Sequence, residues 1–206
     1  MEISASMVKD LREKTGAGMM DCKKALSETS GDFDKAVEYL RKKGIASAAK
    51  KSGRATKEGA VTSYIHGEGK VGVLLEVNCE TDFVARTEQF RQFVKDVAMH
   101  IAAANPQWVN STEVPADIIG KEKEIAVAQM QASGKPAAVL EKIAEGKIKK
   151  FYEDNCLINQ LFVKDPNKTM EQLLKETIGT LGENITIRRF TRYALGDGLA
   201  DSSQSE

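Results

Sequence analysis

Three cysteines and two histidines are the side chains of this chain that most readily do chemistry, as metal ligands or as a nucleophile with its base. Zinc sites need clustered ligands, whereas Cys22, Cys79 and Cys156 are scattered and follow no Cys-x-x-Cys pattern. His66 and His100 are distant from each other in the sequence, and no motif links either of them to a cysteine. We therefore expect no metal site, no cofactor and idle thiols. A small enzyme using Cys79 and His100 is the competing hypothesis.

The segment Gly67-Glu68-Gly69-Lys70 combines glycines with a lysine, as phosphate-binding loops do. A P-loop has four residues between its glycines and a Ser or Thr after the lysine. Here Glu68 alone separates the glycines, and Val71 follows the lysine. We interpret the segment as the turn of a β-hairpin.

An acid and a large apolar ring lie side by side in residues 78–86, Asn-Cys-Glu-Thr-Asp-Phe-Val-Ala-Arg. This stretch falls where a predicted strand ends and a predicted helix begins, so it could present side chains outward from a rigid base. Two plainer interpretations compete with a functional one. Thr81 or Asp82 would serve as an ordinary N-cap. Phe83, seven residues before Phe90, would extend the apolar stripe of the next helix.

Met19 and Met20 are adjacent, so both cannot face one core. We expect one to pack inward and the other to stay near the surface. Methionine suits adaptable protein contacts, so a partner surface and simple core filling both remain open here.

The overall charge is balanced, with 30 basic and 30 acidic residues in a chain of 206. Such a balance creates no global field for nucleic acid or an anionic membrane, so we expect a protein partner or a small ligand. No apolar run is long enough for a bilayer span, and no secretory signal is visible at the start of the chain. The expected location is the compartment of synthesis.

Helical periodicity and glycine breaks predict three short helices in residues 1–52. We expect the breaks at residues 15–18 and at Gly31 and Gly44, with residues 46–51 adding a last turn or two. The N-cap candidates are Ser4, Ser6 and Asp32. A polar linker at residues 53–59 follows.

Residues 60–196 predict a mixed core, followed by a flexible tail at 197–206. A hairpin over residues 61–77 has one apolar face, and residues 90–101 form a helical stripe that should cover it. A helical region over residues 115–151 is split at residues 134–136. A capping box starts another helix at Thr169, and Gly182 ends it. The alternating segment 185–193 predicts a strand that pairs with the hairpin.

Five ordered segments resemble the elongation factor Ts family: residues 11–26, 77–85, 98–103, 133–136 and 162–166. The second contains Thr-Asp-Phe-Val-Ala, which looks like a family signature. The resemblance covers nearly the whole chain. It implies an α+β fold: an N-terminal three-helix bundle of the ubiquitin-associated type, then an α+β core whose small antiparallel sheet is packed by helices. One hairpin-plus-helix unit is visible, as in short family members, which implies a homodimer and a 2:2 complex with the partner.

The same resemblance implies guanine-nucleotide exchange on elongation factor Tu in translation, without bond-making chemistry. The factor would bind the GDP complex, disturb the site of Mg²⁺ and phosphate, release GDP and be displaced by GTP. Residues implied to bind the partner and dislocate Mg²⁺ are Thr81, Asp82, Phe83 and Val84. Residues implied to dock the N-terminal domain are Arg12, Met19 and Met20. His66 is a further candidate, because a similar histidine occurs on a family hairpin.

The alternative function is a protein-interaction module without exchange activity, whose N-terminal bundle binds ubiquitin-like or other partners. Neither reading involves direct nucleic-acid or membrane contact. The family implies a bacterial cytoplasm, or a plastid stroma if the chain is organelle-encoded.

Overall fold

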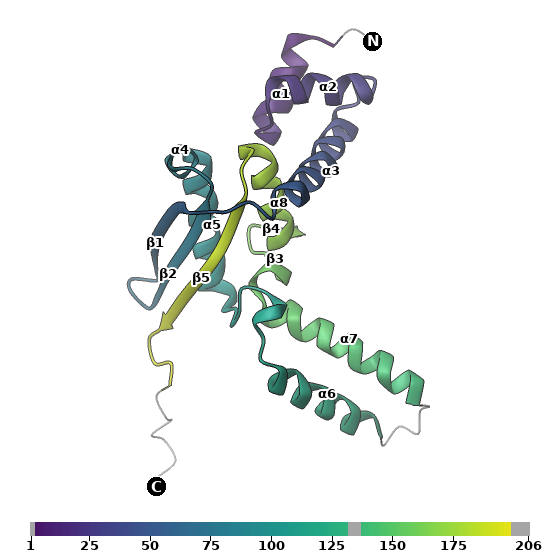
Figure 1. The fold of residues 1–206 in the computed structure, drawn as a ribbon, viewed down its shortest axis with the longest axis vertical. Helices are drawn as coiled ribbons and strands as arrows, with labels where there is room; N and C mark the ends of the chain where they lie inside the picture. The colour runs from purple at the N-terminus through teal and green to yellow at the C-terminus, as the bar shows by residue number, and fades with distance from the viewer. Residues whose placement is uncertain (1–2, 132–136, 199–206) are drawn as a thin grey trace. The chain divides into compact units, whose positions relative to one another are not determined.

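The computed structural model describes residues 3–131 and 137–198 of the chain (Figure 1). Three helices come first: α1 (Ala5–Thr15), α2 (Met19–Glu28) and α3 (Phe33–Lys51). Ser4 caps α1, because its side chain accepts a hydrogen bond from the Met7 amide at 3.2 Å. Asp32 caps α3 by accepting from the Lys35 amide at 3.0 Å. The predicted three-helix start and the caps at Ser4 and Asp32 are confirmed.

The three helices bury a small apolar cluster between them. Its buried members are Val8, Leu11, Cys22, Ala25, Leu26 and Ala36. All three helices contribute, so none of them buries its apolar stripe alone.

The predicted end of the third helix at Gly44 is wrong, because α3 continues through Gly44 to Lys51. The structure gives the reason for a glycine inside a helix. A Cβ built on Gly179 of α8 (Met170–Leu181) would lie 2.7 Å from the Cα of Gly44. Glycine is therefore used here for close approach of two helix backbones and does not stop the helix. Arg41 of α3 pairs with Glu176 of α8 at 3.1 Å beside this crossing.

We predict an asymmetry between the two glycines of this crossing. Gly179→Ala should destabilise the protein by roughly 1–3 kcal/mol, because its Cβ meets helix backbone. Gly44→Ala should be neutral or stabilising by up to about 1 kcal/mol, since its Cβ meets the Gly179 Cα at an ordinary 3.9 Å and alanine favours a helix. Thermal unfolding of the two variants checks this, and equal shifts would contradict the close-approach argument.

A three-stranded sheet has the order β1-β2-β5, formed by β1 (Glu58–His66), β2 (Val71–Cys79) and β5 (Ile185–Ala194). The predicted hairpin and its pairing with the later strand are confirmed. Near one end of β2 the Leu195 amide donates to the Lys70 carbonyl at 2.8 Å, while Arg189 pairs with Glu76 at 2.7 Å. These contacts run in opposite chain directions, so β5 is antiparallel to β2.

One face of β2 is apolar and buried, as predicted for the hairpin. Val73, Leu75, Val77 and Cys79 are each 2 % exposed or less. The helix α5 (Glu88–Ala104) carries the predicted stripe, and its members Phe90, Phe93, Val94, Val97, Ala98 and Ile101 are all buried.

The helical region after α5 contains α6 (Ala116–Gln131) and α7 (Ala137–Asn155), which pack against each other (Figure 1). The predicted split at residues 134–136, and the resemblance at residues 133–136, lie outside the described residues. Two short strands that the sequence did not predict, β3 (Leu161–Phe162) and β4 (Asp165–Thr169), pair antiparallel before α8. Two 3₁₀ turns complete the order, η1 (Ser111–Glu113) and η2 (Leu157–Asn159).

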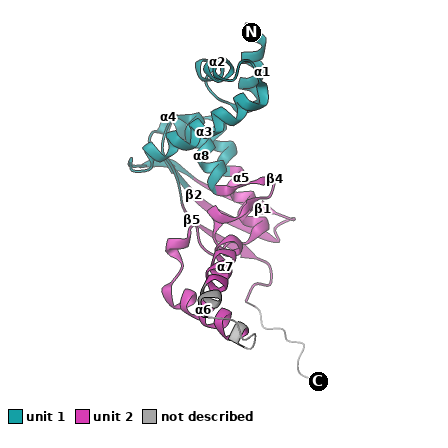
Figure 2. Ribbon diagram, turned by 90° about the vertical axis from the view of Figure 1, so that its right-hand side faces the viewer, with its two compact units in different colours: residues 1–60, 77–94, 171–187 teal, residues 61–76, 95–170, 188–206 magenta. Residues whose placement is uncertain are grey.

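The described chain divides into two compact units, and each contains segments far apart in sequence (Figure 2). The first consists of residues 1–60, 77–94 and 171–187, and the second of residues 61–76, 95–170 and 188–206. The domain bounds expected from the sequence stay a prediction. Helices together with a small antiparallel sheet make the fold α+β, as predicted. In the described parts of the chain, no helix has the length and apolar character of a bilayer span.

Candidate functional site

Phe83 is the most conspicuous apolar side chain of the signature segment. It lies on the one-turn helix α4 (Asp82–Ala85) and is 80 % exposed. The interpretation of Phe83 as an extension of the core stripe is therefore wrong. A second helix start explains why: the Phe90 amide donates to Thr87 Oγ1 at 3.2 Å, so α5 begins anew after α4 and its apolar face does not continue back to Phe83.

Thr81 fixes the start of α4. Its hydroxyl oxygen accepts from the Val84 amide at 3.4 Å, which confirms the N-cap interpretation for Thr81. The same hydroxyl donates to Glu183 Oε1 at 2.6 Å. Glu183 Oε2 accepts from the backbone amides of Glu80 at 3.1 Å and Thr81 at 3.0 Å. The segment before α4 is thus held by a carboxylate that lies a hundred residues further along the chain.

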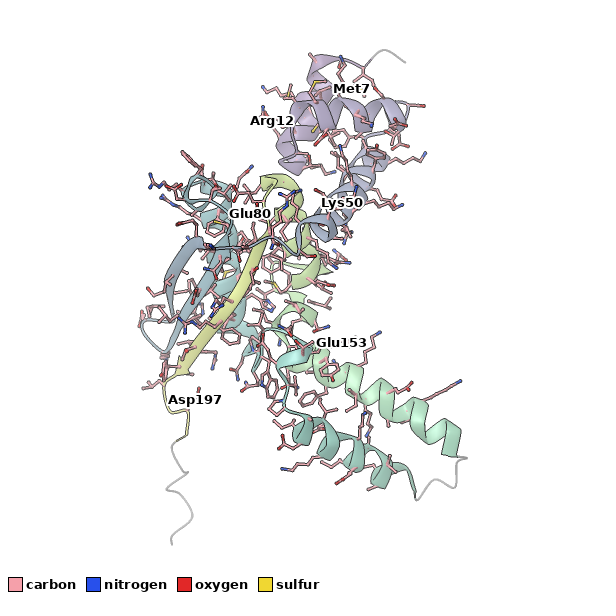
Figure 3. All side chains as sticks on the ribbon, in the orientation of Figure 1. Met7, Arg12, Lys50, Glu80, Glu153 and Asp197 are labelled. Carbon is pink, nitrogen blue, oxygen red and sulfur yellow. The ribbon has the colours of Figure 1, made fainter. Side chains whose placement is uncertain are left out.

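Glu80 makes the reciprocal contact. Its Oε1 accepts from the Asn184 amide at 2.6 Å and lies 3.4 Å from Arg54 Nη1. Asn184 is buried, and its side-chain amide donates to the Arg54 carbonyl at 2.8 Å and the Ser52 carbonyl at 3.4 Å. Figure 3 labels Glu80 in this cluster, where β2 ends, β5 begins and the chain after α3 passes.

Asp82 and Val84 complete the predicted set on α4. Asp82 lies 2.9 Å from Arg86 in an exposed ion pair, and such pairs contribute little stability. Its carboxylate is therefore free to exchange partners at low cost. Val84 is partly exposed. The α4 segment presents an acid and an aromatic ring to solvent from a base of hydrogen bonds.

Met19 and Met20 are both exposed, by 44 % and 77 %. The expectation that one of them packs inward is wrong. Because α2 begins at Met19, both lie in its first turn, while the buried stripe of the helix starts at Cys22. Arg12 is also exposed, on α1 (Figure 3). The exposure supports the partner-surface alternative for the methionines.

Cys79 and His100 do not resemble a nucleophile and its base. Burial, with a contribution from the Glu183 carboxylate, raises the pKa of the Cys79 thiol to about 11, so the thiol is protonated at neutral pH and is a poor nucleophile. The thiol donates to the Thr81 carbonyl at 3.1 Å. His100 is fully buried, bonded to Gln160 Oε1 at 3.0 Å, and burial lowers its pKa. These geometries are typical of structural side chains.

Metal ligands do not gather in the described residues: no group of three or more His, Cys, Asp or Glu side chains there could hold an ion. His66, the additional candidate, is exposed at the end of β1 and its Nδ1 lies 3.1 Å from the Tyr64 hydroxyl. The predicted residues lie on α1, on α2, on α4 with its N-cap, and at the end of β1.

Two residues of this site, Glu183 and Asn184, escaped the sequence analysis. They follow Gly182, which ends α8, and resemble an ordinary polar connection in sequence. The antiparallel pairing of β2 and β5 brings these two residues to the signature segment. This pairing joins distant parts of the chain, so no local sequence pattern indicates the contact.

Large apolar side chains that are exposed, as Met20 and Phe83 are, suit a protein-binding surface. Comparison with known proteins identifies the family of this chain. The family model described as Elongation factor TS matches residues 7–197. Elongation factor Ts of Geobacter metallireducens is 62 % identical over 200 residues, covering 97 % of this chain and 93 % of the relative. Elongation factor Ts of Fervidobacterium nodosum is 60 % identical over 197 residues, covering 96 % of this chain and all of the relative.

The chain therefore belongs to the elongation factor Ts family. It is a translation elongation factor, and the resemblance found in its sequence is confirmed.

Proposed function

We propose that this chain binds elongation factor Tu and accelerates release of its GDP. The observation that carries the proposal is the 80 % exposure of Phe83 on a helix start that Thr81 and Glu183 fix in place. An exposed ring next to the Asp82 carboxylate, on a segment that hydrogen bonds hold at its base, is suited to enter a partner and disturb it.

The proposed target is the site that holds the nucleotide's magnesium ion. Mg²⁺ demands near-octahedral geometry and is held by few protein ligands together with phosphate oxygens. Intrusion of Asp82 and Phe83 between two helices of the GTPase domain would displace such ligands. Small shifts of the ligands then cost much nucleotide affinity, and no covalent bond is made or broken.

Energetics shows that α4 does not act alone. Loosening the nucleotide ten-thousandfold requires about 5.5 kcal/mol of coupling. Burial of one phenylalanine contributes roughly 1.5–3 kcal/mol. The remainder must come from other contacts that favour the nucleotide-free partner, and the exposed Arg12, Met19 and Met20 supply a candidate surface. Because coupling is reciprocal, GTP binding must weaken the binding of the factor by the same free energy.

Stopped-flow release of fluorescent GDP from elongation factor Tu tests this function against the alternative. We expect the rate to rise with the concentration of this chain and to saturate. A protein-interaction module without exchange activity would bind the partner and leave the release rate at its spontaneous value.

We predict that Met20→Ala weakens binding to elongation factor Tu and has little effect on GDP release once the complex has formed. Met20 is 77 % exposed in the free chain, so its burial in a complex would contribute roughly 1.5–3 kcal/mol, about 10- to 100-fold in affinity. Calorimetry with nucleotide-free elongation factor Tu measures the affinity. GDP release at saturating factor should change little, and an unchanged affinity would remove Met20 from the docking surface.

A further inference from the structure

Glu183 lies in the connection between α8 and β5 and accepts three hydrogen bonds from the segment that leads into α4. Its Oε2 accepts from the amides of Glu80 and Thr81 at 3.1 Å and 3.0 Å, and its Oε1 accepts from the Thr81 hydroxyl at 2.6 Å. Both oxygens of one carboxylate are thus directed at two consecutive residues.

The chemistry of these bonds makes the attachment strong. Hydrogen bonds to an ionised carboxylate are shorter and stronger than those between neutral groups. The two amides follow the last residue of β2 and precede the first residue of α4, between the regular elements. Glu183 therefore provides the acceptor that this part of the backbone needs.

Thr81 passes this constraint on to α4. A hydroxyl has one proton, and Thr81 uses it to donate a hydrogen bond to Glu183. A lone pair of the hydroxyl oxygen is then left to accept a hydrogen bond from the Val84 amide. The carboxylate thereby sets the rotamer of the capping side chain. Phe83 is 80 % exposed and has little packing of its own, so its direction depends on the backbone that Thr81 caps.

We propose that Glu183 is a positioning residue for nucleotide exchange: it fixes the direction in which α4 presents Asp82 and Phe83. The inference rests on the proposed exchange function, and it assigns to Glu183 a role that acts through Thr81 and α4. Glu80 supports the arrangement from the opposite side, because its carboxylate accepts from the Asn184 amide at 2.6 Å. The two segments are therefore held by exchanged carboxylate–amide bonds.

The test is Glu183→Ala in the full chain, measured by stopped-flow release of fluorescent GDP from elongation factor Tu. We expect the maximal rate of GDP release to fall about tenfold. A misdirected α4 should slow the release of GDP within the complex but should not hinder formation of the complex. The factor concentration at half-maximal rate should change less than about threefold, since the N-terminal helices are untouched. Loss of binding with an unchanged maximal rate would overturn the proposal.

Glu113→Ala is the matched control. Glu113 Oε2 accepts from the Val109 amide at 3.1 Å and its Oε1 from the Asn110 side chain at 2.6 Å, so the same kind of carboxylate–backbone contact is removed elsewhere. We expect no change in the maximal rate. An equal fall in both variants would mean that any lost carboxylate contact slows exchange, and it would overturn a specific role for Glu183.

A combined variant separates positioning from a general loss of structure. If Glu183 acts through Asp82 and Phe83, then Glu183→Ala should cause no further fall in a background that carries both Asp82→Ala and Phe83→Ala, whereas independent effects would multiply. Multiplying effects would overturn the proposal. Where Glu183→Ala does not fold, Thr81→Val is used in its place. It removes the hydroxyl that bonds both Glu183 and the Val84 amide but keeps the shape of the side chain, and the same comparison applies.

A readout without elongation factor Tu distinguishes this inference from the proposed function. Amide hydrogen exchange over residues 80–87 should become faster in Glu183→Ala and stay unchanged in Glu113→Ala. Unchanged protection in Glu183→Ala would overturn the anchoring role even if exchange activity is established. A wild-type chain that leaves GDP release unaffected would instead refute the proposed function, and with it the positioning role.

Discussion

Phe83→Ala is expected to slow factor-stimulated GDP release about 10- to 100-fold while leaving complex formation nearly intact. The range follows from the roughly 1.5–3 kcal/mol that a buried phenylalanine contributes, if that burial occurs mainly in the distorted complex. Binding energy that appears only in the distorted state raises the rate of release, whereas uniform contacts raise affinity alone. Stopped-flow release at saturating factor measures the effect.

The exposure of Phe83 makes this variant interpretable. A side chain that is 80 % exposed contributes little to the core, so the unfolding free energy should change by about 0.5 kcal/mol or less. Leu195→Ala is the control, because Leu195 is 82 % exposed and lies outside the predicted site. It should leave release unchanged. Wild-type release by the Phe83→Ala chain would exclude the ring as the intruding group.

Gly59→Ala is expected to destabilise the protein by roughly 2–5 kcal/mol, from backbone strain and overpacking together. Gly59 has φ +142°, and a Cβ there would lie 2.2 Å from the Val77 carbonyl oxygen and 2.7 Å from the Asn78 Cα. The clashing atoms are backbone atoms of the neighbouring strand, so no side-chain rotation relieves them. Glycine is thus needed where β1 begins beside the end of β2.

Thermal unfolding checks this prediction, with an expected fall in the midpoint of roughly 5–15 °C. Gly53→Ala is the control, since a Cβ at Gly53 would meet no atom within 4 Å and its φ is not positive. The control should lie within about 0.5 kcal/mol of wild type. A Gly59→Ala chain as stable as the control would show that the strands separate easily at this point.

Local signals predicted most of the elements correctly. Caps such as Asp32, the glycine turn before Val71 and the stripe from Phe90 to Ile101 each depend on residues a few positions apart, so the sequence displays them directly. Gly44 is ambiguous in the sequence, because a glycine can either end a helix or permit the close approach of two backbones. The second use depends on Gly179, which lies in a helix far along the chain.

The candidate site also has some features that the sequence displays and others that it does not. The signature at residues 81–84 was visible in the sequence, and family resemblance supplied its expected role. Its exposure was not visible, because seven-residue spacing to Phe90 equally fits one continuous helix. Glu183 could not be found at all, since its contacts with Glu80 and Thr81 span 103 and 102 residues. Such partners are decided by strand pairing, which local periodicity does not encode.

The carboxylate that holds α4 also sets the order in which the molecule is completed during synthesis. The ribosome makes Thr81 long before Glu183, and the first compact unit needs residues 171–187 as well as 1–60 and 77–94. Contacts between distant residues require closing a long loop and form slowly. A growing chain that has not yet reached Glu183 lacks the acceptor for the amides that precede α4, so a firmly mounted Phe83 requires synthesis to have passed Glu183. The proposed exchange surface is therefore firmly mounted only after synthesis has advanced by the 102 positions that separate Thr81 from Glu183.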